Sequence, residues 1–324
     1  MNNFWKPPRP CILGVIVATC IGMTWADENE DIQKPRNFLL VVGAGGDASY
    51  TDQFHAWADR WKAFVSSRPE ARYHEIGRDP DDQGSDKGRL QRMIETLKDE
   101  EGESTWLVLI GHGTFDRDVA KFNLRGPDVS ARELNQWTSE WKNPLIVINC
   151  ASSSGPFVNR LSGAKRVIVT ATRSGQEQNF ARFGEYLSLA ISDLRADLDH
   201  DDEVSLREAC IMAAGNVASF YESDGRLATE HAILDDNADQ LGTEVRKLDE
   251  VDSPQADGLM SSRIFVFQSD NACILDSQQQ QKRAALEQQL DALKQRKSEL
   301  AEDDYYEQLK TIMIDLAKLY VACQ

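Results

Sequence analysis

The sequence predicts a three-layer α/β sandwich with a mostly parallel sheet, followed by a C-terminal α-helical hairpin. Short, continuous apolar runs have the character of strands buried on both faces, and they alternate with segments whose apolar residues recur at helical spacing. After Asp276 this alternation ends, and leucines recur at helical spacing. Such alternation places helices on both faces of a parallel sheet. The expected strands are 38–42, 71–76, 106–110, 145–149, 166–170 and 263–267.

Helices are expected between these strands, each identified by apolar residues at helical spacing. They lie around 54–65, 90–97, 180–194 and 206–220. In an open parallel sheet, active sites lie beyond the carboxyl ends of the strands. The residues that directly follow the buried strands are therefore the first candidates for a functional site.

The composition excludes some classes of partner. The 324 residues include 36 basic and 53 acidic side chains, which gives a formal net charge of −17. Without a basic stripe to offset this repulsion, we expect no nucleic-acid partner. The acidity is compatible with cation binding. Six cysteines in a chain of this length are too few for a disulfide scaffold.

The first 26 residues have the pattern of an export signal. Lys6 and Arg9 precede an apolar stretch at 11–23, and Thr24-Trp25-Ala26 resembles a small-x-small cleavage site. The stretch is short for a transmembrane span of about 20 residues, although a retained anchor is the alternative. Residues 27–36 are expected to form an acidic linker. We expect a periplasmic or secreted protein with no stable membrane insertion after signal removal.

The segment 276–324 is expected to form an antiparallel helical hairpin. Its leucines recur at helical spacing, and Glu302-Asp303-Asp304 is expected to break the two helices. The hairpin packs on the main domain, 37–275, or on a protein partner. Because its outer ends should lie side by side, we predict a disulfide between Cys273 and Cys323, with two unpaired thiols as the alternative.

Two strand ends carry the first candidate chemistry. His112 follows the strand 106–110 and has a glycine on each side, and Cys150 directly follows the strand 145–149. A thiolate nucleophile needs an imidazole to take its proton and amide donors for the oxyanion. If the two strands are neighbours, both side chains leave the same edge of the sheet. The alternative is a buried, inert cysteine beside a histidine with a purely local role.

A strand that ends in His-Gly, followed by one that ends in Cys, resembles the caspase-like fold of clan CD cysteine peptidases, which includes caspases, legumains and gingipains. The opening NFLLVVGAGGDASYTDQFHAWADRW and the segment VIVTATRSGQEQNFARFGEYL are similar to legumain-type peptidases. The likeness covers roughly 37–267. It implies His112 as general base, Cys150 as nucleophile, and the backbone N–H groups of Gly113 and Cys150 as the oxyanion hole.

The sequence departs from that family at two places. Thr51-Asp52 stands where legumains have Arg-His, and Ile148-Asn149 stands where Gln-Ala or Glu-Ala precedes the cysteine. The first departure weighs against asparagine specificity. A non-catalytic member of the family is therefore an alternative to an active peptidase.

The acidic segment 197–208 has the spacing of an EF-hand calcium loop. Oxygen-bearing side chains occupy the first, third, fifth, ninth and twelfth positions, and a glutamate occupies the seventh. Asp202 stands where the motif has glycine, and a solvated acidic turn is the alternative. The predicted ligands of a structural Ca²⁺ are Asp197, Asp199, Asp201, Glu203, Ser205 and Glu208.

Two weaker patterns are interpreted as turns. The segment around Asp235, Asp236, Asn237 and Asp239 is a second acidic loop without a closing glutamate, because Arg246 is twelfth from Asp235. We interpret this segment as a turn, with an auxiliary cation site as the alternative. The glycine-rich VVGAGGDA after the first strand is favoured as a tight turn over a dinucleotide site, so no organic cofactor is expected.

The sequence therefore favours an exported, calcium-supported cysteine endopeptidase that hydrolyses peptide bonds in proteins or peptides through a thioester. The first alternative is a non-catalytic caspase-like binding or assembly module of the cell envelope, which acts through its hairpin. A nucleotide-linked oxidoreductase is a distant third.

Overall fold

A computed structural model describes residues 35–68, 70–79, 84–98, 100, 104–248, 256–268, 273 and 275–321. The predicted export signal lies outside the described residues, as does the predicted linker up to residue 34. The last two residues of that linker, 35 and 36, already belong to the first strand. None of the described helices is long and apolar enough to cross a bilayer.

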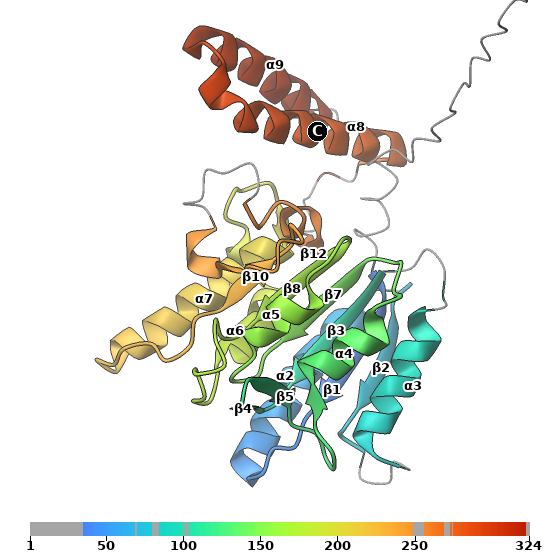
Figure 1. The fold of residues 1–324 in the computed structure, drawn as a ribbon. Coiled ribbons are helices and arrows are strands. Elements are labelled where there is room, and N and C mark those ends of the chain that lie inside the picture. The colour runs from blue at the N-terminus through green and yellow to red at the C-terminus, as the bar shows by residue number, and fades with distance from the viewer. Residues whose placement is uncertain are drawn as a thin grey trace, which may run out of the picture.

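A seven-stranded sheet forms the centre of the domain (Figure 1). Its order is β11-β10-β8-β7-β3-β1-β2, in which the five strands from β8 to β2 run parallel and β10 and β11 run antiparallel to their neighbours. Thus β3 and β7, which precede His112 and Cys150, are neighbours. The strands are β1 (Pro35–Val42), β2 (Arg72–Ile76), β3 (Ser104–Ile110), β7 (Leu145–Asn149), β8 (Arg166–Thr170), β10 (Ile233–Asp235) and β11 (Thr243–Glu244).

Helices cover both faces of this sheet. Alternate residues of β3 divide between two apolar clusters: Val108 packs with the helices α2, α6 and α7, whereas Leu107 packs with α3, α4 and α5. This alternation is what a strand buried on both faces requires. The predicted three-layer sandwich is confirmed. The helices are α2 (Ala48–Ser66), α3 (Asp86–Lys98), α4 (Ala131–Thr138), α5 (Pro156–Leu161), α6 (Phe183–Ala190) and α7 (Leu206–Ser223).

Two predicted elements need correction. The helix expected at 180–194 is only α6, because Asp193 caps a separate short 3₁₀ turn, Leu194–Ala196, by accepting from the N–H of Arg195. The late strand is β12 (Phe265–Gln268), which pairs with β9 (Glu203–Ser205) outside the main sheet. A third small sheet was not predicted and follows His112 in the chain; its strands are β4 (Gly113–Asp116), β5 (Val119–Phe122) and β6 (Val129–Ser130).

The C-terminal hairpin consists of α8 (Ser277–Gln295) and α9 (Glu302–Val321). The residues Glu302-Asp303-Asp304 were expected to break the helices. They instead form the first turn of α9, where acidic side chains interact favourably with the helix dipole. The hairpin has an apolar cluster of its own, separate from the two domain clusters. The buried members of this cluster are Leu275, Leu286, Leu293, Tyr305, Ile312 and Leu319.

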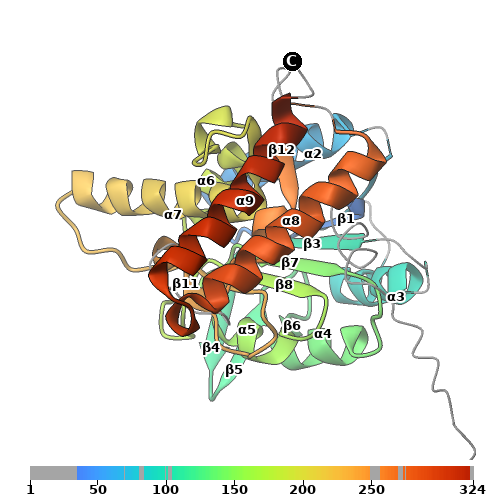
Figure 2. The same ribbon diagram turned by 90° about the horizontal axis from the view of Figure 1, so that it is seen from above.

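The hairpin and the candidate dyad lie at opposite edges of the sheet. We call the edge at which β3 and β7 end the carboxyl edge, and the opposite one the amino edge. Figure 1 shows β4 leaving the carboxyl edge, whereas the hairpin lies beyond the amino edge, and Figure 2 shows that it crosses over the strands there. Cys273, just before the hairpin, is disulfide-bonded. Its predicted partner, Cys323, lies outside the described residues.

Candidate functional site

His112 leaves the carboxyl end of β3 and enters an aromatic pocket. Its ring centroid lies 4.8 Å from that of Tyr50, 5.0 Å from Phe54 and 5.9 Å from Phe180. Its Nε2 atom is 3.2 Å from the carbonyl oxygen of Gly45. Burial lowers the pKa of His112, and the hydrogen bond to Gly45 opposes this shift only in part. The ring is therefore held neutral at physiological pH.

The Cys150 side chain is part of the domain core. The residue is 1% exposed. Its neighbour Gly184 of α6 approaches so closely that a Cβ atom built on it would lie 2.6 Å from Cys150 Cβ and 3.0 Å from Sγ. Burial raises the pKa of the Cys150 thiol to about 12. Because the thiolate is the nucleophile, this thiol is in its unreactive form at neutral pH.

The two residues face the same helical layer but are not paired with each other. His112 and Cys150 are both described, and no hydrogen bond joins them. Trp57 contacts Phe54 and Phe180, two of the rings around His112, and also lies against Gly184 beside the thiol. The sequence brought the two side chains to one edge of one sheet, as the strand order confirms. Aromatic rings surround the half-buried His112, whereas the Cys150 thiol lies in the core.

Both amide groups assigned to the oxyanion hole are already hydrogen-bonded. The N–H of Cys150 donates to the carbonyl oxygen of Leu109 at 2.9 Å. The N–H of Gly113 donates to Ser152 Oγ at 3.4 Å, and the same hydroxyl donates to the carbonyl oxygen of Gly113 at 3.2 Å. Ser152 therefore fastens the turn after β7 to the turn after β3. Sequence spacing did not identify this role.

A second contact secures the same turn from the neighbouring loop. The carbonyl oxygen of Glu177 accepts from the N–H of Ser153 at 2.8 Å. The Glu177 carboxylate lies 2.6 Å from Nδ1 of His231 and 3.2 Å from Nε of Arg173. These residues link the ends of β7 and β8 to the segment before β10. No local sequence motif predicts these contacts, because the partners are up to 54 residues apart.

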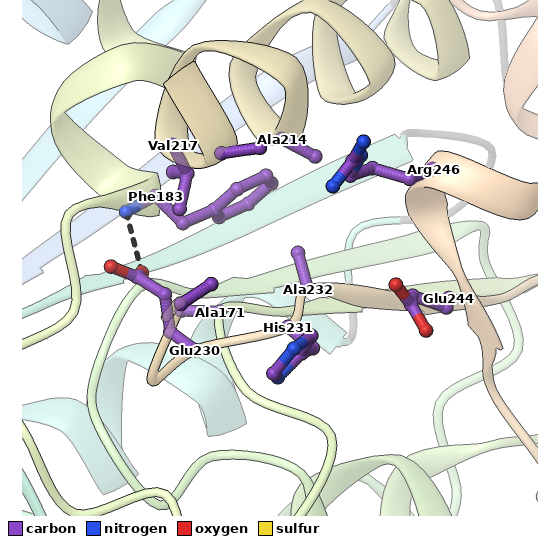
Figure 3. Close-up of a pocket in the computed structure, with 11 residues that line it drawn as sticks. Ala171, Phe183, Ala214, Val217, Glu230, His231, Ala232, Glu244 and Arg246 are labelled. Carbon is purple, nitrogen blue, oxygen red and sulfur yellow. Dashed lines mark hydrogen bonds between the residues drawn. The ribbon is translucent and has the colours of Figure 1, made fainter. Parts of the chain in front are cut away.

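Figure 3 shows a cavity between α7 and the segment that leads into β10. Its volume is about 120 Å³, and Phe183, Ala214 and Val217 line one side. The buried Glu230 carboxylate accepts from the N–H of Phe183 at 3.0 Å and caps the start of α6. Ligand pockets usually enclose about 300–1,000 Å³. This cavity therefore has the size of a packing defect rather than of a substrate pocket.

A larger hollow of about 360 Å³ lies beside two of the rings that contact His112. Tyr50 and Phe180, which contact the His112 ring, also line this hollow. Arg182 lies over the ring of Phe220 on its other side, with 3.9 Å between the guanidinium carbon and the ring centroid. The hollow is large enough for a side chain of a peptide ligand.

The loop 197–208 gathers carboxylates as its spacing predicts. Oxygen atoms of Asp197, Asp199 and Glu208 all lie within 4.8 Å of one another. Asp202, which stands where the motif has glycine, has φ +67°, so the backbone adopts the left-handed conformation that the motif requires there. Glu208 accepts from the N–H groups of Leu198 and Asp199 at 2.8 and 3.3 Å. Whether the loop holds an ion stays a prediction.

Two of the six predicted ligands are paired with the hairpin. Arg283 of α8 is hydrogen-bonded to the Glu203 carboxylate and lies 3.1 Å from that of Asp201. Its side chain is 11% exposed and lies between the rings of Phe265 and Tyr320. Burial, and secondly the charge of Asp199, raises the pKa of Asp201 to about 7, and Arg283 opposes that shift. Arg283 therefore joins the hairpin to the loop.

Comparisons with known proteins add little to this picture. No family model matches the chain, and no curated protein matches it. Among solved structures, the chain is similar to the Drosophila initiator caspase Dronc, with 11% sequence identity and a TM-score of 0.40 over 66% of this chain and 84% of that chain. At this level the likeness carries no argument of its own. The α/β class rests on the strand order and layers described above, and the likeness to legumains stays a prediction.

Proposed function

We propose that the chain is an exported, non-catalytic caspase-like module of the cell envelope that binds a protein partner. The observation that carries this proposal is the environment of Cys150. The thiol is sealed by α6, its pKa is raised to about 12, and it makes no hydrogen bond to His112. Buried cysteines of this kind are packing residues, whereas catalytic ones are partly exposed and have lowered pKa values.

A peptide that carries a thiol-reactive electrophile tests the loss of catalysis. The folded protein, Cys150→Ala, His112→Ala and Cys210→Ala would be treated alike. Cys210 is the matched control, because it is the other buried free cysteine among the described residues. We expect no labelling of any folded protein. In denaturant, both Cys150 and Cys210 should be labelled in the wild type and in His112→Ala, and the remaining one of the two in each cysteine variant. Labelling of the folded chain that disappears in Cys150→Ala and His112→Ala, but persists in Cys210→Ala, would refute the proposal.

A cysteine endopeptidase is the second candidate, and one observation favours it. His112 and Cys150 follow neighbouring strands and face one helical layer, and two of the rings around His112 also line the 360 Å³ hollow. Catalysis would require α6 to withdraw from the thiol so that His112 could take its proton. The labelling experiment separates the candidates, since the peptidase predicts His112-dependent labelling.

The hairpin supplies the binding surface in this proposal. One stripe along α9 is apolar and exposed, because Tyr306, Met313, Ile314 and Val321 fall on an arc of the helix next to the face that packs on α8. Clustered exposed apolar side chains mark interaction sites more often than single ones. A photo-crosslinking residue at 314 should give a discrete product in cells, whereas the same residue at the exposed control position Leu227 should not. Equal products at both positions would contradict this surface.

We also propose that the loop 197–208 holds calcium, as its spacing predicts. The support is the approach of Asp197, Asp199 and Glu208, together with the left-handed backbone at the sixth position. A single loop of this type in an exported protein binds at about 10⁻⁴–10⁻³ M. Millimolar calcium should raise the melting temperature of the wild type by more than that of Asp199→Asn. Equal melting temperatures of the wild type in calcium and in chelator would contradict the site.

A further inference from the structure

The second acidic loop, 235–243, contains a buried carboxylate oxygen without a partner. Asp235 is 0% exposed. Its Oδ1 atom accepts from Ser162 Oγ at 2.9 Å, but its Oδ2 atom has no hydrogen-bond partner. Buried polar atoms in folded proteins are almost always hydrogen-bonded, so an unpartnered carboxylate oxygen calls for a ligand or another explanation.

The Asp235 carboxyl group faces the loop that follows it. Ser162 Oγ donates to Asp235 and also accepts from the N–H of Gln240 at 3.1 Å. Asn159 contacts the same residue, since its amide donates to the carbonyl oxygen of Gln240 at 2.7 Å. The end of α5 thus clamps Asp235 and the sixth residue of the loop together. The unpartnered oxygen belongs to this closed turn.

The backbone of this loop repeats the conformation of the loop 197–208. Counted from Asp235, the fourth and sixth residues are Ala238 and Gln240, with φ +67° and +68°. Counted from Asp197, the same positions are His200 and Asp202, with φ +62° and +67°. Left-handed backbone is unfavourable for such residues, so its recurrence at matching positions marks one loop type used twice.

The two loops differ in how their first aspartate is satisfied. In the first loop, Asp197 accepts from the N–H groups of His200, Asp201 and Asp202 at 2.7–3.2 Å, so both of its oxygens are bonded. In the second loop, Asp235 accepts a hydrogen bond from the Ser162 hydroxyl, and it is this hydroxyl, not Asp235, that accepts from the backbone N–H of Gln240. Asp235 therefore retains an acceptor that the protein itself does not use.

The surroundings of Asp235 are negative. Asp236 and Asp257 are buried nearby, and their carboxylates accept from backbone N–H groups, including those of Gly258 and Thr243 at 2.8 and 3.0 Å. Within the described residues, no lysine or arginine forms an ion pair with Asp235, Asp236, Asp239 or Asp257.

We propose that the loop 235–243 binds a divalent cation, calcium, independently of the loop 197–208. Asp235, Asn237 and Asp239 occupy the first, third and fifth positions of the loop, and the backbone carbonyl of Leu241 is at the seventh. Oxygen ligands in a flexible turn suit calcium better than magnesium, which demands octahedral geometry. This site is separate from the binding function proposed above and does not depend on it.

The loop lacks a closing glutamate, which sets its expected affinity. Fewer charged ligands weaken an EF-type loop, so the dissociation constant should fall at the weak end of the extracellular range, about 10⁻³ M. The ion would occupy a structural site at the amino edge, where β10 leaves the sheet. It would neutralise charge that the fold leaves uncompensated.

Equilibrium dialysis with radioactive calcium on the whole chain tests this assignment. The wild type, Asp239→Asn, Asp199→Asn and the double variant are titrated to about 20 mM calcium, well above the expected dissociation constant, so that the number of ions bound at saturation is compared. Asp239 is exposed, so its substitution leaves the core intact. We expect Asp239→Asn to bind one ion fewer than the wild type, and the double variant to bind two fewer. A melting curve without calcium checks that all four chains fold alike.

Each outcome decides the question. If the wild type binds one ion and Asp239→Asn abolishes it, the second loop is the site and the first is not. If Asp239→Asn binds as many ions as the wild type, or if the wild type binds none, the proposal is overturned. A chain that loses its only ion in Asp199→Asn also overturns it, without affecting the calcium proposal for the first loop.

Discussion

The two edges of the central sheet differ in how their polar groups are satisfied. At the carboxyl edge, the N–H groups of Cys150 and Gly113 are bonded within the protein, and the thiol is covered by α6. At the amino edge, Asp235 keeps an oxygen without a partner, and Asp201 and Glu203 of the loop 197–208 share one arginine from the hairpin. At the first edge these groups have partners within the protein, whereas at the second a carboxylate oxygen remains available to a ligand.

The binding surface and cation sites proposed above therefore lie away from the edge where a parallel sheet normally carries its active site. The general rule puts active sites beyond the carboxyl ends of strands. Here that edge carries His112 and Cys150, and the Cys150 thiol is packed in the core. The amino edge carries the hairpin and both acidic loops. The following predictions test this contrast, from the largest expected effect to the smallest.

The largest effect is expected at the amino edge, from Arg283→Met. This change leaves the Asp201 and Glu203 carboxylates without their cation, and breaking a buried pair in this way costs about 3 kcal/mol. Denaturant unfolding measures the loss. The matched control is Arg296→Met, because Arg296 is exposed and pairs only loosely with Glu299 at 3.7 Å. Equal stability of the two variants would show that the hairpin is not held by Arg283.

A smaller loss is expected at the carboxyl edge, from Gly184→Ala. The added methyl group would lie 2.6 Å from Cys150 Cβ and 2.9 Å from the Trp57 ring. Overpacking of this kind costs about 1–3 kcal/mol. Gly215→Ala in α7 is the control, because no atom lies within 4 Å of its added methyl group, so the substitution should stabilise the helix by about 0.5–1 kcal/mol. The same sign in both variants would contradict the close packing of α6 on the thiol.

A pH-dependent effect is expected at Glu133, which caps α4. Although burial opposes ionisation, hydrogen bonds from Lys87 and Ser130 lower the pKa of Glu133 to about 2. A lowered folded-state pKa adds stability above the unfolded-state value, about 4.3, and this stability is lost as the pH falls towards 2. Glu133→Gln should therefore be less stable than the wild type at pH 7 and equal to it near pH 2. A constant difference across this range, measured by thermal melting, would count against the ion pair.

Much of the fold follows from local pattern. The runs 145–149 and 166–170 coincide with β7 and β8, because strands buried on both faces carry continuous apolar residues that polar alternation does not interrupt. Short strands such as β10 and β11 were missed, because three residues or fewer give no periodicity to detect. The position of β12 was missed because its partner, β9, is itself three residues long.

The candidate site was less predictable than the fold. The sequence placed His112 and Cys150 at one edge, and the strand order confirms that their strands are neighbours. The depth of the thiol depends on Gly184, which is 34 positions later and carries no signal of its own. The link from Arg283 to Asp201 spans 82 positions and likewise leaves no pattern in the sequence. Residue spacing predicts which side chains share a strand or a loop. The burial of those side chains and their long-range contacts depend on tertiary packing.

The central claim is that the Cys150 thiol belongs to the core. The most direct test is the pH dependence of iodoacetamide alkylation of Cys150 in folded Cys210→Ala protein. Because burial raises the pKa of this thiol to about 12, its alkylation should be far slower than in the unfolded chain and should rise with pH without a plateau below about pH 8. A plateau near neutral pH that disappears in His112→Ala would reveal an activated thiolate, and would contradict the claim.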